Sequence, residues 1–386
     1  MNKILVLIPY YFPGFRSGGP QQSIRNLADA FGKQLDLYIY TQNHDFGSDI
    51  PYEGVPYDQW VKLFGSHIWY ASSDYYGKRF KEFYSSFDCI YSCGFFEKNT
   101  IKLLFLHKRK KAKKEIYIAP MGVFSEGAIN IKRYKKELFL KLGKLLKIFA
   151  GGGVNQIIWS VSSLDELTDT KKYLGEEIVQ KYIVAEDLPR KVYFNNSLEK
   201  AEKRGDYEVL KIVFLSRITP KKNLDYCADI LNQKYSKHIQ FDIYGILEDK
   251  EYWKKCQEKL STLPQNVTAN YCGELNPDKV IQALSSYDVF LFPTKGENYG
   301  HVIYEALAAG CVTIISDTTP WKGFEVYGCG RVVRLDDLEG FQSSIEDLCR
   351  TDRDRLVEMK KNSVRFAEKT YKNSVTISGY KHLMTE

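Results

Sequence analysis

Short apolar runs alternate with amphipathic stretches along the first half of the chain. Lys3–Ile8 is an apolar run that predicts a buried strand, and Gln21–Phe31 places its apolar residues on one helical face. Phe46–Tyr57 is rich in Gly, Pro and acidic residues and predicts a loop. Further strands in this half are predicted at Leu35–Tyr40, Cys89–Tyr91, Ile116–Ala119 and Gln156–Val161.

The same alternation resumes at Lys211–Leu215, the first predicted strand of the second half. Helices are predicted from about Leu224 and at Tyr252–Leu260, Pro277–Ser285 and Tyr371–Met384. The remaining strands are predicted at Gln240–Tyr244, Val267–Tyr271, Asp288–Thr294, Val312–Ile315 and Arg331–Arg334. Because strands and helices alternate, the sequence predicts an α/β protein whose parallel sheets are covered by helices.

A polar segment, Asn195–Tyr207, separates the two halves and contains few bulky residues. A chain of 386 residues is long enough for two or three domains. We therefore expect one domain over residues 1–195 and another over residues 207–370.

Composition narrows the class of protein. Apolar residues make up 44% and charged residues 27%, as in ordinary globular proteins. No stretch approaches 18 uncharged apolar residues, so we expect no transmembrane helix, and the apolar run at the N-terminus is too short for a signal peptide. The eight cysteines match neither a zinc site nor a disulfide framework, which favours reduced thiols in a cytoplasmic protein.

The net charge of +7 is concentrated in two basic segments of the first half, 108–114 and 132–149. In the second of these, Leu138, Leu142, Leu145, Ile148 and Phe149 fall on one helical face and the lysines lie elsewhere. Such a helix suits an anionic membrane surface, although a surface helix whose lysines extend to water fits equally well. Nucleic-acid binding is not expected, because no recognition motif accompanies the basic residues.

Two carboxylates, Glu297 and Glu305, lie eight positions apart where the predicted strand Asp288–Thr294 gives way to a helix. Gly310 provides a stop signal for that helix. Eight helical residues rise about 12 Å, so the two carboxylates would serve separate parts of a long ligand. Two surface carboxylates near a helix are the simpler alternative, which the agreement of strand, turn and glycines disfavours.

The same element offers backbone donors to an anion. A helix that begins near Asn298–Gly300 would direct the N–H groups of Tyr299, Gly300 and His301 toward a phosphate. These groups and the carboxylates together suit the binding of a sugar nucleotide.

Basic residues follow the first strand of the second half. Arg217 comes directly after this strand, and Lys222 follows near a helix start, with Lys221 as an alternative in register. The guanidinium fork of Arg suits bidentate phosphate contact, and Lys supplies a compact charge. Alone, the pattern would describe solvated surface residues equally well.

A glycine-rich loop, Pro9–Pro20, joins the first strand to the first helix. Glycine allows the backbone to approach a ligand closely, and a helix N-terminus attracts anions, although an ordinary connecting loop has the same composition. The loop contains no Gly-x-Gly-x-x-Gly pattern, so a nicotinamide site is weakly supported.

Taken in order, these segments resemble retaining glycosyltransferases of the GT-B fold, family 4 (glycosyl transferases group 1), of the bacterial surface-polysaccharide type. The resemblance covers nearly the whole chain and is strongest over residues 211–335. It implies two Rossmann-like domains whose parallel sheets face an interdomain cleft. It also implies that a C-terminal helix, 371–386, crosses back to the first domain, which holds the acceptor, while the second holds the donor.

The resemblance implies a role for each matching residue. Arg217 and Lys222 hold the donor diphosphate, Glu297 the hydroxyls of the donor sugar, and Glu305 those of the ribose. Cys272 lies in a loop that receives the base through backbone groups. The remaining positions expected to bind the donor are Gly18, Gly19, Asn298, Tyr299, Gly300 and His301.

The middle of the chain departs from the pattern of these relatives. Met121 stands where they carry Arg within a Pro-Arg-Gly motif, and Ser160 where they carry His after Trp. A pair of acids, Asp352 and Asp354, resembles the metal-binding pair of another fold, but its charged, late helical context predicts a solvated face. No metal or cofactor is expected.

We therefore expect a cytoplasmic, metal-independent hexosyltransferase that moves a sugar from a nucleotide diphosphate sugar to a saccharide or lipid-linked saccharide, at the inner membrane face. Met121 and Ser160 motivate one alternative, a non-catalytic relative that binds a nucleotide sugar or a partner transferase. A nucleotide-sugar epimerase of the same fold is a third possibility, but the His and acidic groups it requires at the sugar are poorly represented here.

Overall fold

The computed structural model describes residues 3–72, 79–110, 114–130, 133–145, 157–194 and 208–384. The chain divides into two compact units, one comprising Met1–Leu188 with Ser374–Glu386 and the other Pro189–Asn373. The polar segment in which we expect the boundary, Asn195–Tyr207, lies outside the described residues. Each unit has its own sheet and its own core.

The first unit is built on an eight-stranded sheet in the order β3-β4-β2-β1-β5-β6-β7-β8. Strand β3 runs antiparallel to β4, and the other paired strands are parallel. The strands are β1 (Lys3–Leu7), β2 (Asp36–Gln42), β3 (Trp60–Leu63), β4 (Ser66–Ala71), β5 (Cys89–Cys93), β6 (Ile116–Ala119), β7 (Ile157–Val161) and β8 (Tyr182–Val184).

Helices cover both faces of this sheet, because successive side chains of a strand point to opposite faces. Leu5 and Leu7 of β1 pack in one core cluster with residues of α2 (Arg79–Ser86), α3 (Lys98–Lys110), α5 (Arg133–Leu145) and α6 (Leu164–Leu174). Ile4 and Val6 pack in another with residues of α1 (Gly19–Phe31) and the terminal 3₁₀ helix η3 (Gly379–Met384). A short helix, α4 (Glu126–Asn130), precedes α5.

The second unit has a six-stranded sheet in the order β11-β10-β9-β12-β13-β14, parallel throughout. The central strands are buried on both faces, as expected where helices cover both sides. The strands are β9 (Val209–Leu215), β10 (His238–Tyr244), β11 (Val267–Tyr271), β12 (Val289–Phe292), β13 (Val312–Ser316) and β14 (Gly330–Val333).

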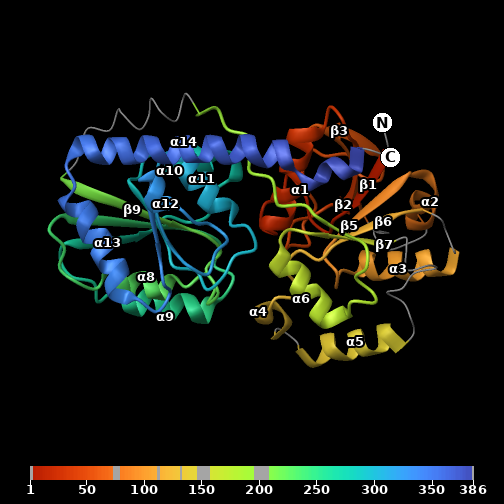
Figure 1. Cartoon of the computed structure of the whole chain (residues 1–386), viewed down its shortest axis with the longest axis horizontal. Coiled ribbons are helices and arrows are strands. Elements are labelled where there is room, and N and C mark those ends of the chain that lie inside the picture. The colour runs from red at the N-terminus through yellow and green to blue at the C-terminus, as the bar shows by residue number, and fades with distance from the viewer. Residues whose placement is uncertain are drawn as a thin grey trace. The chain divides into compact units, whose positions relative to one another are not determined.

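In Figure 1, α8 (Leu224–Leu231) and α9 (Lys250–Leu260) lie on one face of the second sheet, and α10 (Val280–Leu284) and α11 (His301–Ala309) on the other. Helix α13 packs against α8, and α10 packs against α11. The unit also contains η2 (Pro277–Lys279), α12 (Phe324–Tyr327), α13 (Leu338–Arg350) and α14 (Arg353–Ile377).

The α/β fold with two mainly parallel sheets confirms the predicted fold class. Two predicted elements need correction. The helix expected from Asn298–Gly300 begins at His301, because Gly300 adopts a left-handed backbone conformation. The helix expected at Tyr371–Met384 is instead the end of the 25-residue helix α14, followed by η3. Within the described ranges, no helix is long and apolar enough to cross a bilayer.

Candidate active site

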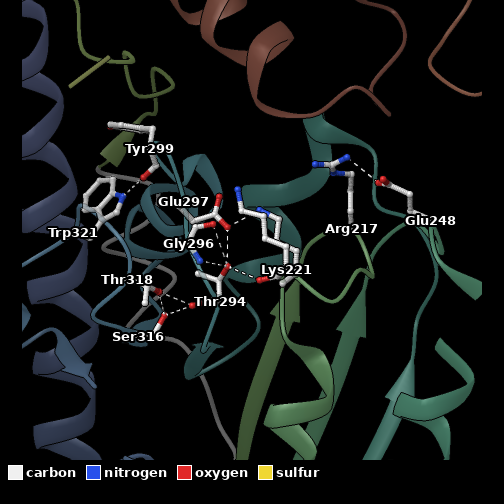
Figure 2. Close-up of polar contacts among 11 residues, drawn as sticks. Arg217, Lys221, Glu248, Thr294, Gly296, Glu297, Tyr299, Ser316, Thr318 and Trp321 are labelled. Atoms are coloured by element: carbon white, nitrogen blue, oxygen red, sulfur yellow. Dashed lines mark hydrogen bonds and ion pairs between the residues drawn. The ribbon is translucent and has the colours of Figure 1, made fainter. Parts of the chain in front are cut away.

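The predicted donor residues of the second unit lie in loops that follow its strands. Arg217 follows β9, Cys272 follows β11, and Glu297 follows β12. Because all strands of this sheet are parallel, these loops leave from the same edge, which is where ligands bind in open α/β sheets. Figure 2 shows the residues at this edge.

Lys222 and Glu297 form the central ion pair of this edge. The Lys222 Nζ donates a hydrogen bond of 2.5 Å to the Glu297 Oε1, and both side chains are largely shielded from solvent. The Thr294 hydroxyl donates to the same carboxylate oxygen at 3.1 Å. A partly buried carboxylate thus lies in direct contact with a cation.

The loops that carry this pair are joined by further hydrogen bonds. The Lys295 N–H donates to the Lys221 carbonyl oxygen at 2.9 Å, and the Asn223 Nδ2 donates to the Pro293 carbonyl oxygen at 2.9 Å. Asn223 has a φ of 62° at the entrance of α8, a conformation that Asn tolerates better than most residues. The β9 and β12 loops therefore form one connected structure.

The loop after β13 supports the Glu297 loop from its other side (Figure 2). The Ser316 and Thr318 hydroxyls donate to the Thr294 carbonyl oxygen at 2.5 and 2.6 Å. The indole Nε1 of Trp321 donates to the Tyr299 carbonyl oxygen at 2.5 Å. These bonds fix the backbone on both sides of Glu297.

The start of α11 differs from the expected geometry. Gly300 is the residue before the first helical turn and has a φ of 82°, and its carbonyl oxygen accepts from the Ile303 N–H at 2.8 Å. Asn298 and Tyr299 precede the helix, so Glu297 is not on the helix and the 12 Å helical rise does not describe its separation from Glu305. Burial lowers the pKa of His301, the first helical residue, to about 4, although Glu297 raises it.

Arg217 contacts a different carboxylate from the one bound by Lys222. Its Nη1 lies 2.8 Å from the Glu248 Oε2, in a pair that is about 40% exposed (Figure 2). Loss of hydration lowers the pKa of Lys221, and the neighbouring charges of Lys222 and Arg217 lower it further, while Glu297 opposes the shift. Lys221, Lys222 and Arg217 therefore repel one another at this edge, and a bound anion would reduce this repulsion.

Glu305 pairs with a different cation from the one bound by Glu297. It is buried on α11, and its Oε1 is 3.6 Å from the Nη1 of Arg190, a residue that the sequence analysis did not select. Burial raises the pKa of Glu305 to about 7, and Arg190 lowers it.

The remaining predicted residues lie in separate loops. Cys272 is exposed, and its N–H donates to the Ile243 carbonyl oxygen at 2.8 Å. Gly18 and Gly19 belong to the first unit, where Gly18 precedes α1 with a φ of 78°. The Phe15 N–H of the same loop donates to the carboxylate of Asp45, which follows β2, at 2.9 Å.

The positions that depart from the family pattern have structural roles. The Ser160 hydroxyl is buried and lies 3.0 Å from the Tyr91 hydroxyl. Met121 has a φ of 60° in the turn after β6. Asp352 and Asp354 are exposed, and the Asp352 Oδ1 accepts from the Arg355 N–H at the start of α14. No cluster of three or more His, Cys, Asp or Glu that could hold a metal ion occurs in the part of the chain that is described.

Part of the chain matches a known protein family. Residues 196–364 match the family model described as Glycosyl transferases group 1. Glycogen synthase of Thermosipho melanesiensis is 28% identical over 148 residues, which are 34% of this chain and 30% of that protein. The chain therefore matches less than a third of the length of this curated relative. The matched residues, less than half of the chain, are therefore similar to glycosyl transferases group 1.

Solved structures share the fold over almost the full chain. Sucrose-phosphate synthase of Thermosynechococcus elongatus has a TM-score of 0.68 at 14% identity and covers 97% of both chains. HepE of Anabaena, solved in complex with UDP and glucose, has a TM-score of 0.64 at 14% identity and covers 96% of both. The fold is therefore that of GT-B glycosyltransferases.

Proposed function

We propose that the chain is a retaining, metal-independent hexosyltransferase that transfers a sugar from a nucleotide diphosphate sugar to a hydroxyl group of a saccharide or lipid-linked saccharide during surface-polysaccharide assembly. The observation that carries the proposal is the ion pair between Lys222 and Glu297, at 2.5 Å, on the ligand-binding edge of the second sheet. The match to the group 1 family model and the UDP bound by HepE support it.

The diphosphate would be bound by the cations at this edge. In this proposal, Arg217 leaves Glu248 and Lys222 turns from Glu297 toward the phosphate oxygens, with Lys221 adding charge nearby. Charged donors of this kind stabilise the negative charge that develops on the leaving diphosphate. They could therefore supply the role that a metal ion has in other transferases.

The carboxylates would bind the groups on either side of the diphosphate. Glu297 would accept hydrogen bonds from the donor sugar, Glu305 from the ribose, and the loop at Cys272 would receive the base through its backbone. The transition state at the anomeric carbon would resemble an oxocarbenium ion. The departing phosphate would take the proton of the acceptor hydroxyl on the same face of the sugar, so that the configuration is retained.

Helix α5 provides a surface for a membrane-bound acceptor. Tyr134, Leu138, Leu142 and Leu145 lie along one side of this helix and are between 47% and 87% exposed. Arg133 and the lysines 135, 141 and 144 are exposed on the same helix. Residues 146–149 of the predicted amphipathic stretch lie outside the described residues. We propose that α5 rests on an anionic membrane, as apolar side chains flanked by basic ones do.

The catalytic proposal is tested by incubating the protein with UDP-, GDP- and ADP-sugars and oligosaccharide acceptors. We expect transfer with retained anomeric configuration from one donor, and loss of this transfer in Glu297→Ala. Nucleotide-sugar binding without transfer would support a non-catalytic relative, and conversion of the donor without an acceptor would support an epimerase.

The membrane proposal is tested by liposome flotation. We expect binding to vesicles that contain phosphatidylglycerol, and weaker binding to neutral vesicles or after the replacement of Lys135, Lys141 and Lys144 by Gln. Equal flotation of the variant and the natural protein would contradict a role for α5.

A further inference from the structure

Arg190 brings three parts of the second unit together. It lies in the segment between β8 and β9, away from the family elements that the sequence revealed. Its Nη1 donates to the Pro277 carbonyl oxygen at 2.6 Å, and its Nη2 to the Asp278 Oδ1 at 3.1 Å. The same Nη1 lies 3.6 Å from the Glu305 Oε1. One guanidinium thus links η2 to the buried carboxylate of α11.

Glu305 depends on this guanidinium for its charge. Its side chain is only 11% exposed, and an ionised carboxylate in such a place is unfavourable unless a cation compensates it. The charged and titratable groups around it are Arg190, Asp278 of η2, which shares that guanidinium, and Tyr304, its neighbour on α11. Of these, Arg190 is the cation.

We propose that Arg190 is a positioning residue that keeps Glu305 ionised and oriented to accept hydrogen bonds from the ribose hydroxyls of the donor nucleotide. This inference rests on the proposed function, and it extends it to a residue outside the matched family elements.

The division of the Arg190 hydrogen bonds supports this role. Its two shortest contacts are with η2, so the guanidinium is held in place by a partner other than Glu305. At 3.6 Å the guanidinium attracts the carboxylate without occupying its acceptor positions through a short bond. An ionised carboxylate has only acceptor sites, whereas a protonated carboxyl also has an O–H donor that needs an acceptor. Arg190 therefore leaves Glu305 available to two hydroxyl donors.

The pKa of Glu305 makes the role measurable. With Arg190 present, this pKa is raised by burial to about 7. Removal of the guanidinium charge raises it further, because the attraction that lowers it is lost. Near neutral pH, a larger fraction of Glu305 is then protonated and ribose binding weakens.

The test is calorimetric titration of the full chain with the nucleoside diphosphate that it binds among UDP, GDP and ADP, and with the 2′,3′-dideoxy form of the same nucleotide. The variants are Arg190→Gln and Arg190→Lys, with Arg350→Gln as the matched control, because Arg350 is 73% exposed and pairs with Glu346 within α13. Each pair is titrated on both sides of pH 7, and the melting temperature without ligand reports the effect on folding.

We expect Arg190→Gln to weaken binding of the ribonucleotide about fivefold at neutral pH, because loss of the guanidinium leaves a smaller fraction of Glu305 ionised. Binding of the dideoxy form should be unchanged, and the pH at which ribonucleotide affinity falls should move upward. Arg190→Lys should reverse part of this upward shift, and Arg350→Gln should match the natural protein.

Equal weakening of both nucleotides, or an unchanged pH profile in Arg190→Gln, would show that Arg190 has only a structural role. If Arg190→Gln does not fold, Arg190→Lys decides, because it should still discriminate less between the two nucleotides than the natural protein. A natural protein that binds no nucleoside diphosphate would refute the proposed function itself. One that binds both forms equally would refute the role of Glu305.

Discussion

The Glu297 carboxylate receives hydrogen bonds from both Lys222 and Thr294. Because one donor is charged and the other is neutral, the charge of Glu297 can be removed by substitution while a hydrogen bond still holds its side chain. Glu297→Gln keeps the shape of the side chain and removes the charge. We expect it to lower kcat at least about a hundredfold, the size of effect seen when a reacting group is misplaced. Steady-state kinetics with the identified donor provides the measurement.

Glu248→Gln is the matched control, since Glu248 is also paired with a cation but is exposed. Exposed ion pairs contribute at most about 1 kcal/mol, so kcat should stay within about fivefold. A similar loss of kcat in both variants would contradict a specific role for Glu297.

Glu305 also predicts a pH dependence of stability. Its pKa rises from 4.5 to about 7 on folding, so the folded state binds the proton more tightly than the unfolded chain. The contribution of this proton to the free energy of unfolding is fully present below pH 4.5 and is lost as the pH rises through about 7. Glu305→Gln has no ionisable group at this position. Its free energy of unfolding should therefore fall less as the pH rises, by up to roughly 3 kcal/mol.

The measurement is urea unfolding of the natural protein and Glu305→Gln at about pH 5 and about pH 8. Asp187, whose pKa burial raises to about 6, changes stability in the same direction and is present in both proteins. The comparison therefore isolates Glu305. An identical pH dependence in the two proteins would contradict the assigned pKa.

At the scale of single residues, motif spacing could predict Lys222 and Glu297, because each follows a strand at a fixed offset. It could not predict Arg190 or Glu248. Arg190 reaches Glu305 across 115 positions, and Glu248 reaches Arg217 from the next strand of the sheet. No local pattern marks either residue. The roles of Cys272, Gly18 and Gly19 stay predictions.

Among the elements, the entrance of α11 requires a left-handed backbone conformation. Gly300 has a φ of 82°, and an added Cβ would lie 2.9 Å from the Ile303 Cδ1. Gly300→Ala should therefore destabilise the protein by about 1–2 kcal/mol and shift the loop that carries Glu297. Thermal unfolding and donor KM give the two readouts.

Gly127 of α4 offers the control, since an added Cβ there meets no atom within 4 Å and its φ is not left-handed. Gly127→Ala should leave the melting temperature unchanged or slightly raised, because Ala favours helix more than Gly does. If Gly300→Ala is equally neutral, the left-handed entrance is not required.

Predictions of elements from sequence worked where burial is strong. Apolar runs such as Val289–Phe292 are buried on both faces, and their hydrophobicity alone marks them as strands. The pair β3 and β4 was not predicted: β3 is only partly buried and shows no clear alternation, and β4 was missed although it is largely buried. The length of α14 was also missed, since its surface residues obscure the period of its buried face.

At the scale of the whole molecule, the two units have separate hydrophobic cores. We expect calorimetric heating to show two transitions. A nucleoside diphosphate at a hundred times its Kd should stabilise the second unit by about 2.7 kcal/mol and raise one transition by several degrees. Arg217→Ala should remove this gain, and a shift that survives in that variant would place nucleotide binding elsewhere.

The polarity of Asn195–Tyr207 suggested a division of the chain near this segment, and the compact units meet in sequence at Leu188 and Pro189. Composition could indicate the region because linkers avoid bulky residues. It could not reveal that Ser374–Glu386 is grouped with the first unit, since that depends on packing between distant segments.

Tyr380 and Leu383 of η3 are buried in the same cluster as Ile4 and Val6 of β1. A ribosome synthesises η3 only after β1 and the whole of the second unit. The first unit to be started is therefore the last to be completed, and the second can reach its native state while the first still exposes apolar surface. During synthesis, this unfinished face is where a chaperone would bind.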